Sequence, residues 1–265
     1  MRKIRIIRRI ARRPQGEPTS ARDALILMVA VIAVAAYAIF FGLQTLVWLE
    51  THRWAHADPW LRDMPQAVTD APAQPGATEL KAFDFEFKVP WSGKQKAVSA
   101  PDRVEFRFDS GPVVILFDPE AQVDLLRTIT SEEPTQYNQF HNIFLNQSFA
   151  SNYDLYSAVY SARPAAVSPW VPLRDAVRIN QLLLWKLAFG LPAAPGIHAI
   201  TFGANRGFEF GDPSSGRPVA LQIFNGRDAQ FRFLFLVAAG SGAKISQEEI
   251  NSVVASLEPV PIAER

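Results

Sequence analysis

The chain has 265 residues, and its 27 basic and 26 acidic side chains leave a formal net charge of +1. This near balance argues against a nucleic-acid partner, because such proteins carry a strongly basic face. Cysteine is absent, which excludes disulfides, thiolate nucleophiles and cysteine-ligated zinc. The charge is unevenly placed, however, since residues 1–22 contain eight Lys or Arg and a single acid, Glu17. The excess of positive charge therefore lies at the N-terminus.

A long apolar segment follows this basic arm, which we place at residues 1–23. Residues 24–49 are 26 consecutive uncharged side chains, nearly all of them apolar. A helix of that length reaches roughly 39 Å at 1.5 Å per residue. The hydrocarbon core of a bilayer needs only about 20 residues. The pattern predicts a transmembrane helix over 24–49.

The charges that flank this helix predict its orientation. Positively charged residues stay on the cytoplasmic side, and those that matter most here are Arg5, Arg8, Arg9, Arg12 and Arg13. We therefore expect the N-terminus in the cytoplasm and the main domain in the periplasm, on the outer side of the inner (plasma) membrane. Ile4, Ile7 and Ala11 also lie at helical spacing, so the arm is open to a second interpretation, as an amphipathic helix on anionic lipid. Membrane lipid is an expected partner in either case.

A cleaved signal peptide is the alternative to an anchor. Ala36-Tyr37-Ala38 resembles a signal-peptidase site, and the apolar residues before it have the length of a signal core. The apolar run continues without a break beyond Ala38, which favours an uncleaved anchor. The Arg8-Arg9 pair suggests a twin-arginine signal, but no matching pattern surrounds it.

Residues 50–80 predict a juxtamembrane segment and then a tether rich in Pro and Ala. The tether shows no apolar period, which is typical of a semi-extended linker. Aromatic rings are frequent at headgroup level, and we expect Trp48, Trp54 and Trp60 to lie there.

Two histidines in this juxtamembrane segment form the only candidate metal site. His52 and His56 are four residues apart, on one face of a helix, and Asp58 follows closely. The segment lacks the glutamate that zinc proteases place after the first histidine. The alternative is a pair of interfacial side chains beside Trp54, because a bound ion would need ligands from a partner chain.

The remaining sequence predicts one α+β domain over residues 81–260, followed by a tail at 261–265. Apolar residues alternate with period 2 in several strands and recur with helical period between them. The expected strands are 81–89, 103–109, 113–117, 196–203, 206–211, 218–225 and 230–239, and the expected helices are 120–129, 135–146, 152–162, 172–189 and 246–257. This order indicates a largely antiparallel sheet with a helical insert.

The last expected helix has the clearest signature in the chain. Ser246 and Glu249 form a capping box at its start. Ile250, Val253 and Leu257 then form one apolar stripe. The spacing predicts that this stripe packs on the sheet.

Three stretches resemble the Mog1/PsbP-like α/β/α sandwiches. They are the opening strand "FDFEFKVP", the hairpin "PVALQIFNGRDAQFRFLFLVA" and the closing "ISQEEINSVVASLEP". Members of that group are mostly non-enzymatic binding or assembly factors, so the resemblance implies an accessory role. The chain departs from the pattern in its helical insert, residues 119–190, and in its membrane anchor. No functional residue is carried over.

No catalytic motif is recognisable, and we predict no catalytic residue and no cofactor. The sequence contains no Gly-x-Ser-x-Gly elbow. A polar helix face is the one candidate groove, and its members are Tyr137, His141, Asn142 and Asn146. Such a face is also typical of a solvated helix with a satisfied histidine, so both interpretations stay open.

The helix expected over 172–189 is unusual because apolar residues surround a single lysine, Lys186. It is too short to span a membrane. Either it is the central helix of the core, or it offers one face to a membrane or a neighbouring subunit.

We therefore expect a single-pass membrane protein whose exported domain binds partners as a non-enzymatic accessory or assembly subunit of a membrane-protein complex. One alternative is a membrane-tethered hydrolase with a site near His141. The other is a carrier of an apolar ligand, which a cavity lined by phenylalanine side chains would favour.

Overall fold

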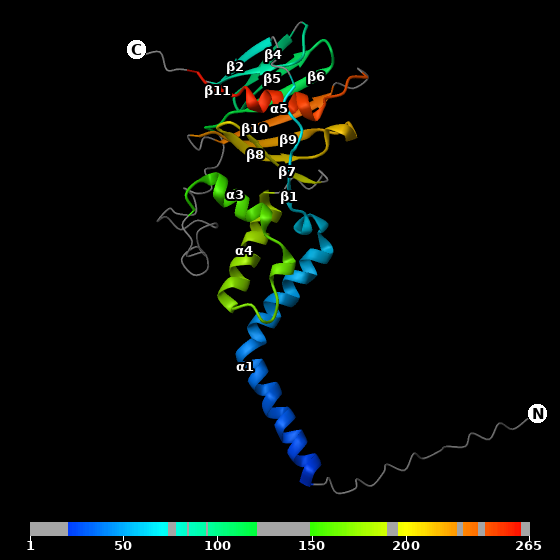
Figure 1. The fold of residues 1–265 in the computed structure, drawn as a ribbon, viewed down its shortest axis with the longest axis vertical. Helices are drawn as coiled ribbons and strands as arrows, with labels where there is room; N and C mark the ends of the chain where they lie inside the picture. The colour runs from blue at the N-terminus through cyan, green and yellow to red at the C-terminus, as the bar shows by residue number, and fades with distance from the viewer. Residues whose placement is uncertain are drawn as a thin grey trace, which may run out of the picture. The chain divides into compact units, whose positions relative to one another are not determined.

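The computed structural model describes residues 21–73, 78–83, 85–93, 95–120, 149–189, 196–226, 230–237 and 242–260. The chain forms two compact units, Met1–Leu43 and Gln44–Arg265. Figure 1 shows the elements coloured along the chain. Each unit is described by itself below.

The first unit holds the start of one long helix, α1 (Ala21–Ala57), which continues into the second unit. The stretch Leu25–Ala57 is strongly apolar, and its most apolar part is not buried within the structure. Within the described part of the chain, α1 alone is long and apolar enough to cross a membrane. By length and composition it is a candidate membrane anchor or signal sequence, which agrees with the expected apolar helix over 24–49.

Within its described residues, the second unit contains three further α-helices, α3 (Asn152–Ser161), α4 (Leu173–Phe189) and α5 (Gln247–Ala255). Short 3-10 helices are η1 (Pro59–Arg62), η3 (Pro164–Ala166) and η4 (Pro213–Ser215). The side chain of Ser151 caps α3 by accepting from the Asp154 amide. The predicted capping box of Ser246 and Glu249 is confirmed at the start of α5.

The largest element is an eight-stranded sheet with the order β1-β7-β8-β9-β10-β6-β5-β4. Every neighbouring pair is antiparallel except β1 and β7, which are parallel. The strands are β1 (Pro65–Ala67), β4 (Gln95–Ala100), β5 (Arg103–Phe108), β6 (Pro112–Phe117), β7 (Ile197–Phe202), β8 (Asn205–Phe210), β9 (Val219–Phe224) and β10 (Gln230–Val237). The expected α+β class with a mostly antiparallel sheet is therefore confirmed.

A second, three-stranded sheet has the order β11-β3-β2 and consists of β2 (Thr78–Ala82), β3 (Phe85–Val89) and β11 (Glu258–Pro259). One uninterrupted strand over 81–89 was expected, and this expectation is wrong. Phe83 adopts a left-handed backbone conformation, with φ of 52°. The chain therefore turns there, and β2 pairs antiparallel with β3.

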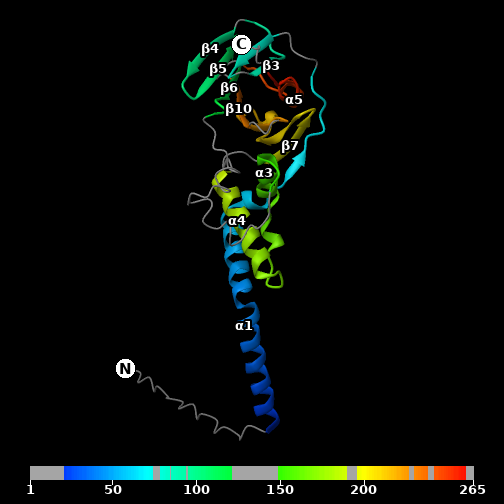
Figure 2. The same cartoon turned by 90° about the vertical axis from the view of Figure 1, so that its left-hand side faces the viewer.

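The two faces of the large sheet carry separate apolar clusters, because side chains alternate between faces along each strand. One face packs against α5 and the small sheet, and its members include Phe87, Ile223, Phe233 and Val253. The opposite face packs against α3 and α4, with Phe208, Phe224, Tyr156 and Leu183 among its members. Figures 1 and 2 show α5 on the sheet and the pair α3 and α4 beyond β7 and β8.

The segment expected as juxtamembrane residues and tether contributes to the packed unit. Leu61 of η1 is 0% exposed, and Trp60 is 7% exposed in the α3/α4 cluster. β1, which was not expected as a strand, pairs with β7. Apolar periodicity cannot reveal such short elements, because each contributes only one or two buried side chains.

Candidate functional site

A cavity of about 300 Å³ lies between the large sheet and the helices α3 and α4. It is bounded by strands β6, β8, β9 and β10, by Tyr160 of α3 and by Phe189 of α4. Its wall is rich in aromatic residues, with Phe117, Phe189 and Phe210 beside the backbone of β10. We call this cavity the aromatic pocket.

Polar groups enter the aromatic pocket in one row across the sheet. Gln222 of β9 lies opposite Arg232 of β10, and Arg232 lies opposite Phe117 of β6. Residues in register share one face of a sheet, so all three side chains project toward the α3/α4 side. The hydroxyl of Tyr160 donates to Oε1 of Gln222 at 2.8 Å. The pocket thus combines an apolar wall with a few convergent polar groups, which is typical of ligand sites.

Two tyrosines keep their protons beside this row. Burial raises the pKa of Tyr156 and raises the pKa of Tyr160 well above its ordinary value. The positive charge of Arg232 opposes both shifts without reversing them. Both phenols are therefore neutral at physiological pH, and the charge of Arg232 is not offset by a phenolate.

Several buried amide atoms near Arg232 lack hydrogen-bond partners. Nε2 of Gln222 has none, and neither Nε2 nor Oε1 of Gln230 has one. Gln222 is 4% exposed and Gln230 is 7% exposed. An unsatisfied buried polar group costs about 1–3 kcal/mol. Gln222 also lines the aromatic pocket, so its amide is available to a bound molecule, whereas Gln230 lies beside Arg232 and is not part of the lining.

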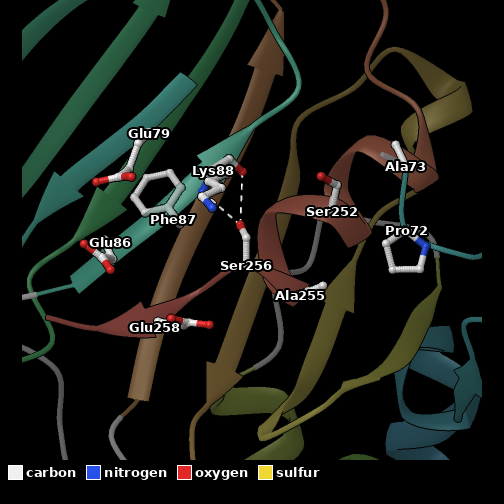
Figure 3. A pocket seen from close by; sticks show the side chains of 10 residues that line it. All are labelled: Pro72, Ala73, Glu79, Glu86, Phe87, Lys88, Ser252, Ala255, Ser256 and Glu258. Atoms are coloured by element: carbon white, nitrogen blue, oxygen red, sulfur yellow. Dashed lines mark hydrogen bonds between the residues drawn. The ribbon is translucent and has the colours of Figure 1, made fainter. Parts of the chain in front are cut away.

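A second cavity, also of about 300 Å³, lies between α5, β3 and residues 72–73. Figure 3 shows Ser252 of α5 and Ser256, the C-cap residue of that helix, across from Phe87 and Lys88 of β3. Ser256 joins the two elements, because its Oγ accepts from the Lys88 amide at 2.8 Å. Ser252 is buried and its hydroxyl has no partner. No histidine lines this cavity among the residues that the structure describes.

Two of the three carboxylates that line this second cavity share one lysine as their partner. Lys81 pairs with Glu79 at 3.1 Å and with Glu86 at 2.8 Å. These pairs lie at the surface, where an ion pair contributes at most about 1 kcal/mol. The cavity therefore offers weaker recognition than the aromatic pocket.

A buried carboxyl group lies on the α5 face of the sheet. Glu209 of β8 is 0% exposed, and its Oε2 accepts from Gln247 Nε2 at 2.7 Å. Its Oε1 has no partner. Burial, with smaller contributions from Asp212 and Asp70, raises the pKa of Glu209 to about 7. His198 lies opposite Glu209 in the register of β7 and β8.

The lysine singled out in the sequence points into the core. Lys186 is 0% exposed, and Nζ donates to the carbonyl oxygens of Tyr160 at 2.9 Å, Ala162 at 3.2 Å and Asp63. Burial lowers its pKa to about 8, so the ammonium group persists at pH 7. Three donors thus meet three acceptors, and α4 is a core helix on this face.

The two histidines of the candidate metal site lie near arginine side chains. His52 and His56 line a shallow cavity with Arg62 and Arg163, and Asp58 instead accepts from the Trp60 amide. Within the described ranges, no three His, Cys, Asp or Glu side chains could together hold a metal ion. Guanidinium groups repel a metal cation, so this cavity is poorly suited to one.

The other predicted residues divide between the described part of the chain and the rest. Trp60 was expected at headgroup level, but it is buried, and its Nε1 donates to the Lys186 carbonyl at 3.1 Å. Trp48 and Trp54 are half-buried on α1. The topology arginines and the predicted groove lie outside the described residues, and they are Arg5, Arg8, Arg9, Arg12, Arg13, Tyr137, His141, Asn142 and Asn146.

The sequence patterns did not predict the aromatic pocket. Gln222 lies on β9, and Gln230 and Arg232 lie at alternate positions of β10. Polar residues at such positions are normally solvated when the other face of the strand is apolar. The sequence feature that pointed to this site was the pair Tyr156 and Tyr160, two large aromatic residues on one expected helix that must pack against another surface. The sequence did not show which helices cover this face of the sheet, because that depends on the tertiary structure.

Comparison with known proteins does not extend this description. No family model, curated protein or solved structure matches the chain. The likeness to Mog1/PsbP-like sandwiches therefore stays a resemblance in the quoted residues.

Proposed function

We propose that this protein is a single-pass, membrane-anchored binding protein, and that its main domain holds a small apolar ligand in the aromatic pocket. The observation that carries the proposal is the pocket itself, a cavity of about 300 Å³ with Phe117, Phe189 and Phe210 in its wall. Ligand sites begin at roughly this volume and are lined mainly by apolar and aromatic side chains. A close-packed core would leave no such space.

The anchor gives this activity a location. The basic arm and the apolar helix α1 support insertion in the inner membrane with the N-terminus in the cytoplasm and the main domain in the periplasm. An anchored domain stays at a high effective concentration beside the bilayer. Apolar molecules also concentrate in the bilayer, so a tethered binding domain is placed where its ligand is found.

Filling the pocket tests the proposal. Ala220 lies in the pocket wall, and Ala220→Phe places a ring in the cavity. We expect the full chain in lipid nanodiscs to bind decanol, as measured by titration calorimetry against empty nanodiscs, and we expect Ala220→Phe to lose at least about tenfold in affinity. Val98→Phe, on exposed strand β4, is the matched control and should bind like the unaltered chain.

The proposal is wrong if the unaltered chain shows no binding beyond that of empty nanodiscs. It is also wrong if Ala220→Phe and Val98→Phe bind decanol equally well. Thermal unfolding of both variants shows whether each is folded at the temperature of the titration.

A second candidate is an accessory subunit that docks on a membrane-protein partner. The observation that favours it is Trp170, which is 72% exposed in the connection between η3 and α4. Exposed tryptophans are enriched among the residues that dominate protein interfaces. If this candidate is correct, Trp170→Ala will abolish cross-linking to a membrane-protein partner, and Ala220→Phe will retain it. The hydrolase alternative depends on His141 and stays a prediction, which the activity of His141→Ala would test.

A further inference from the structure

The aromatic pocket contains one cationic side chain whose charge is uncompensated within the described structure. Arg232 lies at the middle of the row Gln222, Arg232 and Phe117. Among the described residues, the ion pairs join other groups, and no carboxylate pairs with Arg232. Taking a cation partly out of water is costly unless it gains an opposite charge.

The neighbours of Arg232 on the same face add donors that lack acceptors. Gln230 is two residues before Arg232 on β10, so both side chains project to the α3/α4 side. Gln222 is its cross-strand neighbour on β9. The Nε2 atoms of both glutamines are buried and make no hydrogen bond. Arg232 and Gln222 line the aromatic pocket, so a guanidinium group and an amide donor meet in one apolar cavity, and Gln230 lies beside Arg232 on the same face.

An oxygen anion satisfies both polar groups that line the pocket, the Arg232 guanidinium and the Gln222 amide. The planar fork of a guanidinium group matches the two oxygens of a carboxylate, and charge-assisted hydrogen bonds are about twice as strong as neutral ones. Each carboxylate oxygen can also accept a further bond from an amide. The neutral phenols of Tyr156 and Tyr160 add no negative charge that would oppose such a ligand.

We infer that the ligand of the aromatic pocket is an amphipathic monocarboxylate, with its carboxylate on Arg232 and the amide of Gln222 and its apolar body against Phe117, Phe189 and Phe210. This inference rests on the proposed function, because it names the chemical class of the ligand in the same pocket. It also explains why a polar row is buried on a face that could have been entirely apolar. An apolar ligand alone would leave these donors unsatisfied.

The test compares decanoate, decanol and decylammonium on the full chain in lipid nanodiscs, with empty nanodiscs subtracted. We expect decanoate to bind about tenfold to a hundredfold more tightly than decanol, and decylammonium to bind most weakly. Arg232→Gln should remove the preference for decanoate over decanol. Arg206→Gln is the matched control, because Arg206 lies on the same face but stacks on Tyr153 at 4.1 Å, outside the pocket.

The outcomes separate the inference from the function on which it rests. If none of the three molecules binds, the proposed function is wrong, and the inference falls with it. If decanol and decanoate bind equally, or if Arg232→Gln keeps the preference, the pocket binds apolar ligands without reading a carboxylate, and the inference is overturned. Thermal unfolding of Arg232→Gln shows whether this variant is folded. Arg232→Lys keeps the charge without the planar fork, and we expect it to restore part of the preference.

Discussion

Lys186 is the residue at which three segments of the second unit converge. Its ammonium group donates to carbonyl oxygens that follow η1 and end α3, at Asp63, Tyr160 and Ala162. Nζ also lies 5.9 Å from the centre of the Trp60 ring. The side chain therefore joins α4 to two other elements through a single charged group.

Replacing this lysine should destabilise the domain. Lys186→Met keeps most of the side-chain volume but leaves three buried carbonyls without donors, so we expect a loss on the order of 3 kcal/mol in the free energy of unfolding. Leu184→Met on the same helix is the control, because Leu184 is 37% exposed. Surface changes of this kind stay within about 0.5 kcal/mol. Equal denaturant midpoints for the two variants would contradict the role assigned to Lys186.

Glu209 should make stability depend on pH in the opposite sense to an ordinary paired carboxylate. Its folded pKa of about 7 lies above its ordinary value of 4.5, so the folded state holds more protons than the unfolded state between these values. Its contribution to stability is complete below about pH 4.5 and is lost as the pH rises through 7. From the shift, that contribution is about 3 kcal/mol at most.

The comparison with Glu209→Gln isolates this group from His198, Asp70 and Asp212 around it. We expect the variant to gain stability relative to the unaltered chain as the pH is raised from 5 to 8, as measured by thermal unfolding at each pH. Glu258→Gln, at an exposed position, should follow the unaltered chain. A constant difference between Glu209→Gln and the unaltered chain would show that Glu209 titrates normally.

At the scale of elements, the last turns of α1 and the short helix η1 belong to the packed unit. Thr51 is 0% exposed and its Oγ1 is 3.0 Å from Oδ1 of Asn180 on α4. Trp60 and Leu61 of η1 are buried in the cluster under α3 and α4. The domain thus begins before residue 81, where the apolar alternation starts.

Two truncations test this boundary. A chain that begins at Gln44 should unfold cooperatively, because the second compact unit begins there. A chain that begins at Met64 loses Trp60 and Leu61, and removal of one large buried side chain costs about 3–5 kcal/mol. We expect its melting temperature to fall well below that of the Gln44 form. Equal melting temperatures would mean that η1 is dispensable for the fold.

At the scale of the whole molecule, the N-terminal charges should control insertion. Protease added outside intact spheroplasts should digest the domain that follows α1 and spare the basic arm. Substitution of five arginines by glutamine should produce a mixed orientation, because few other charges bias the flanks; they are Arg5, Arg8, Arg9, Arg12 and Arg13. Protection of the main domain in the unaltered protein would overturn the proposed topology.

Local patterns in the sequence determined most of the individual elements. The length of α1, the capping box of α5 and the alternation in β5, β6, β9 and β10 depend on residues near one another in the chain. Such signals arise from helical and strand periodicity, which a single sequence displays directly. The buried stripe of Ile250, Val253 and Leu257 follows from the same periodicity.

Only the tertiary structure decided what covers each face, and this placed the candidate site. Alternation shows that Gln222 and Arg232 share a face with their neighbours, but it cannot show that α3 and α4 pack over part of it. Local sequence likewise does not predict the partners of Lys186, because its three carbonyl acceptors come from distant segments of the chain. The physical reason is that burial depends on contacts between residues far apart in the chain, and local periodicity carries no information about them.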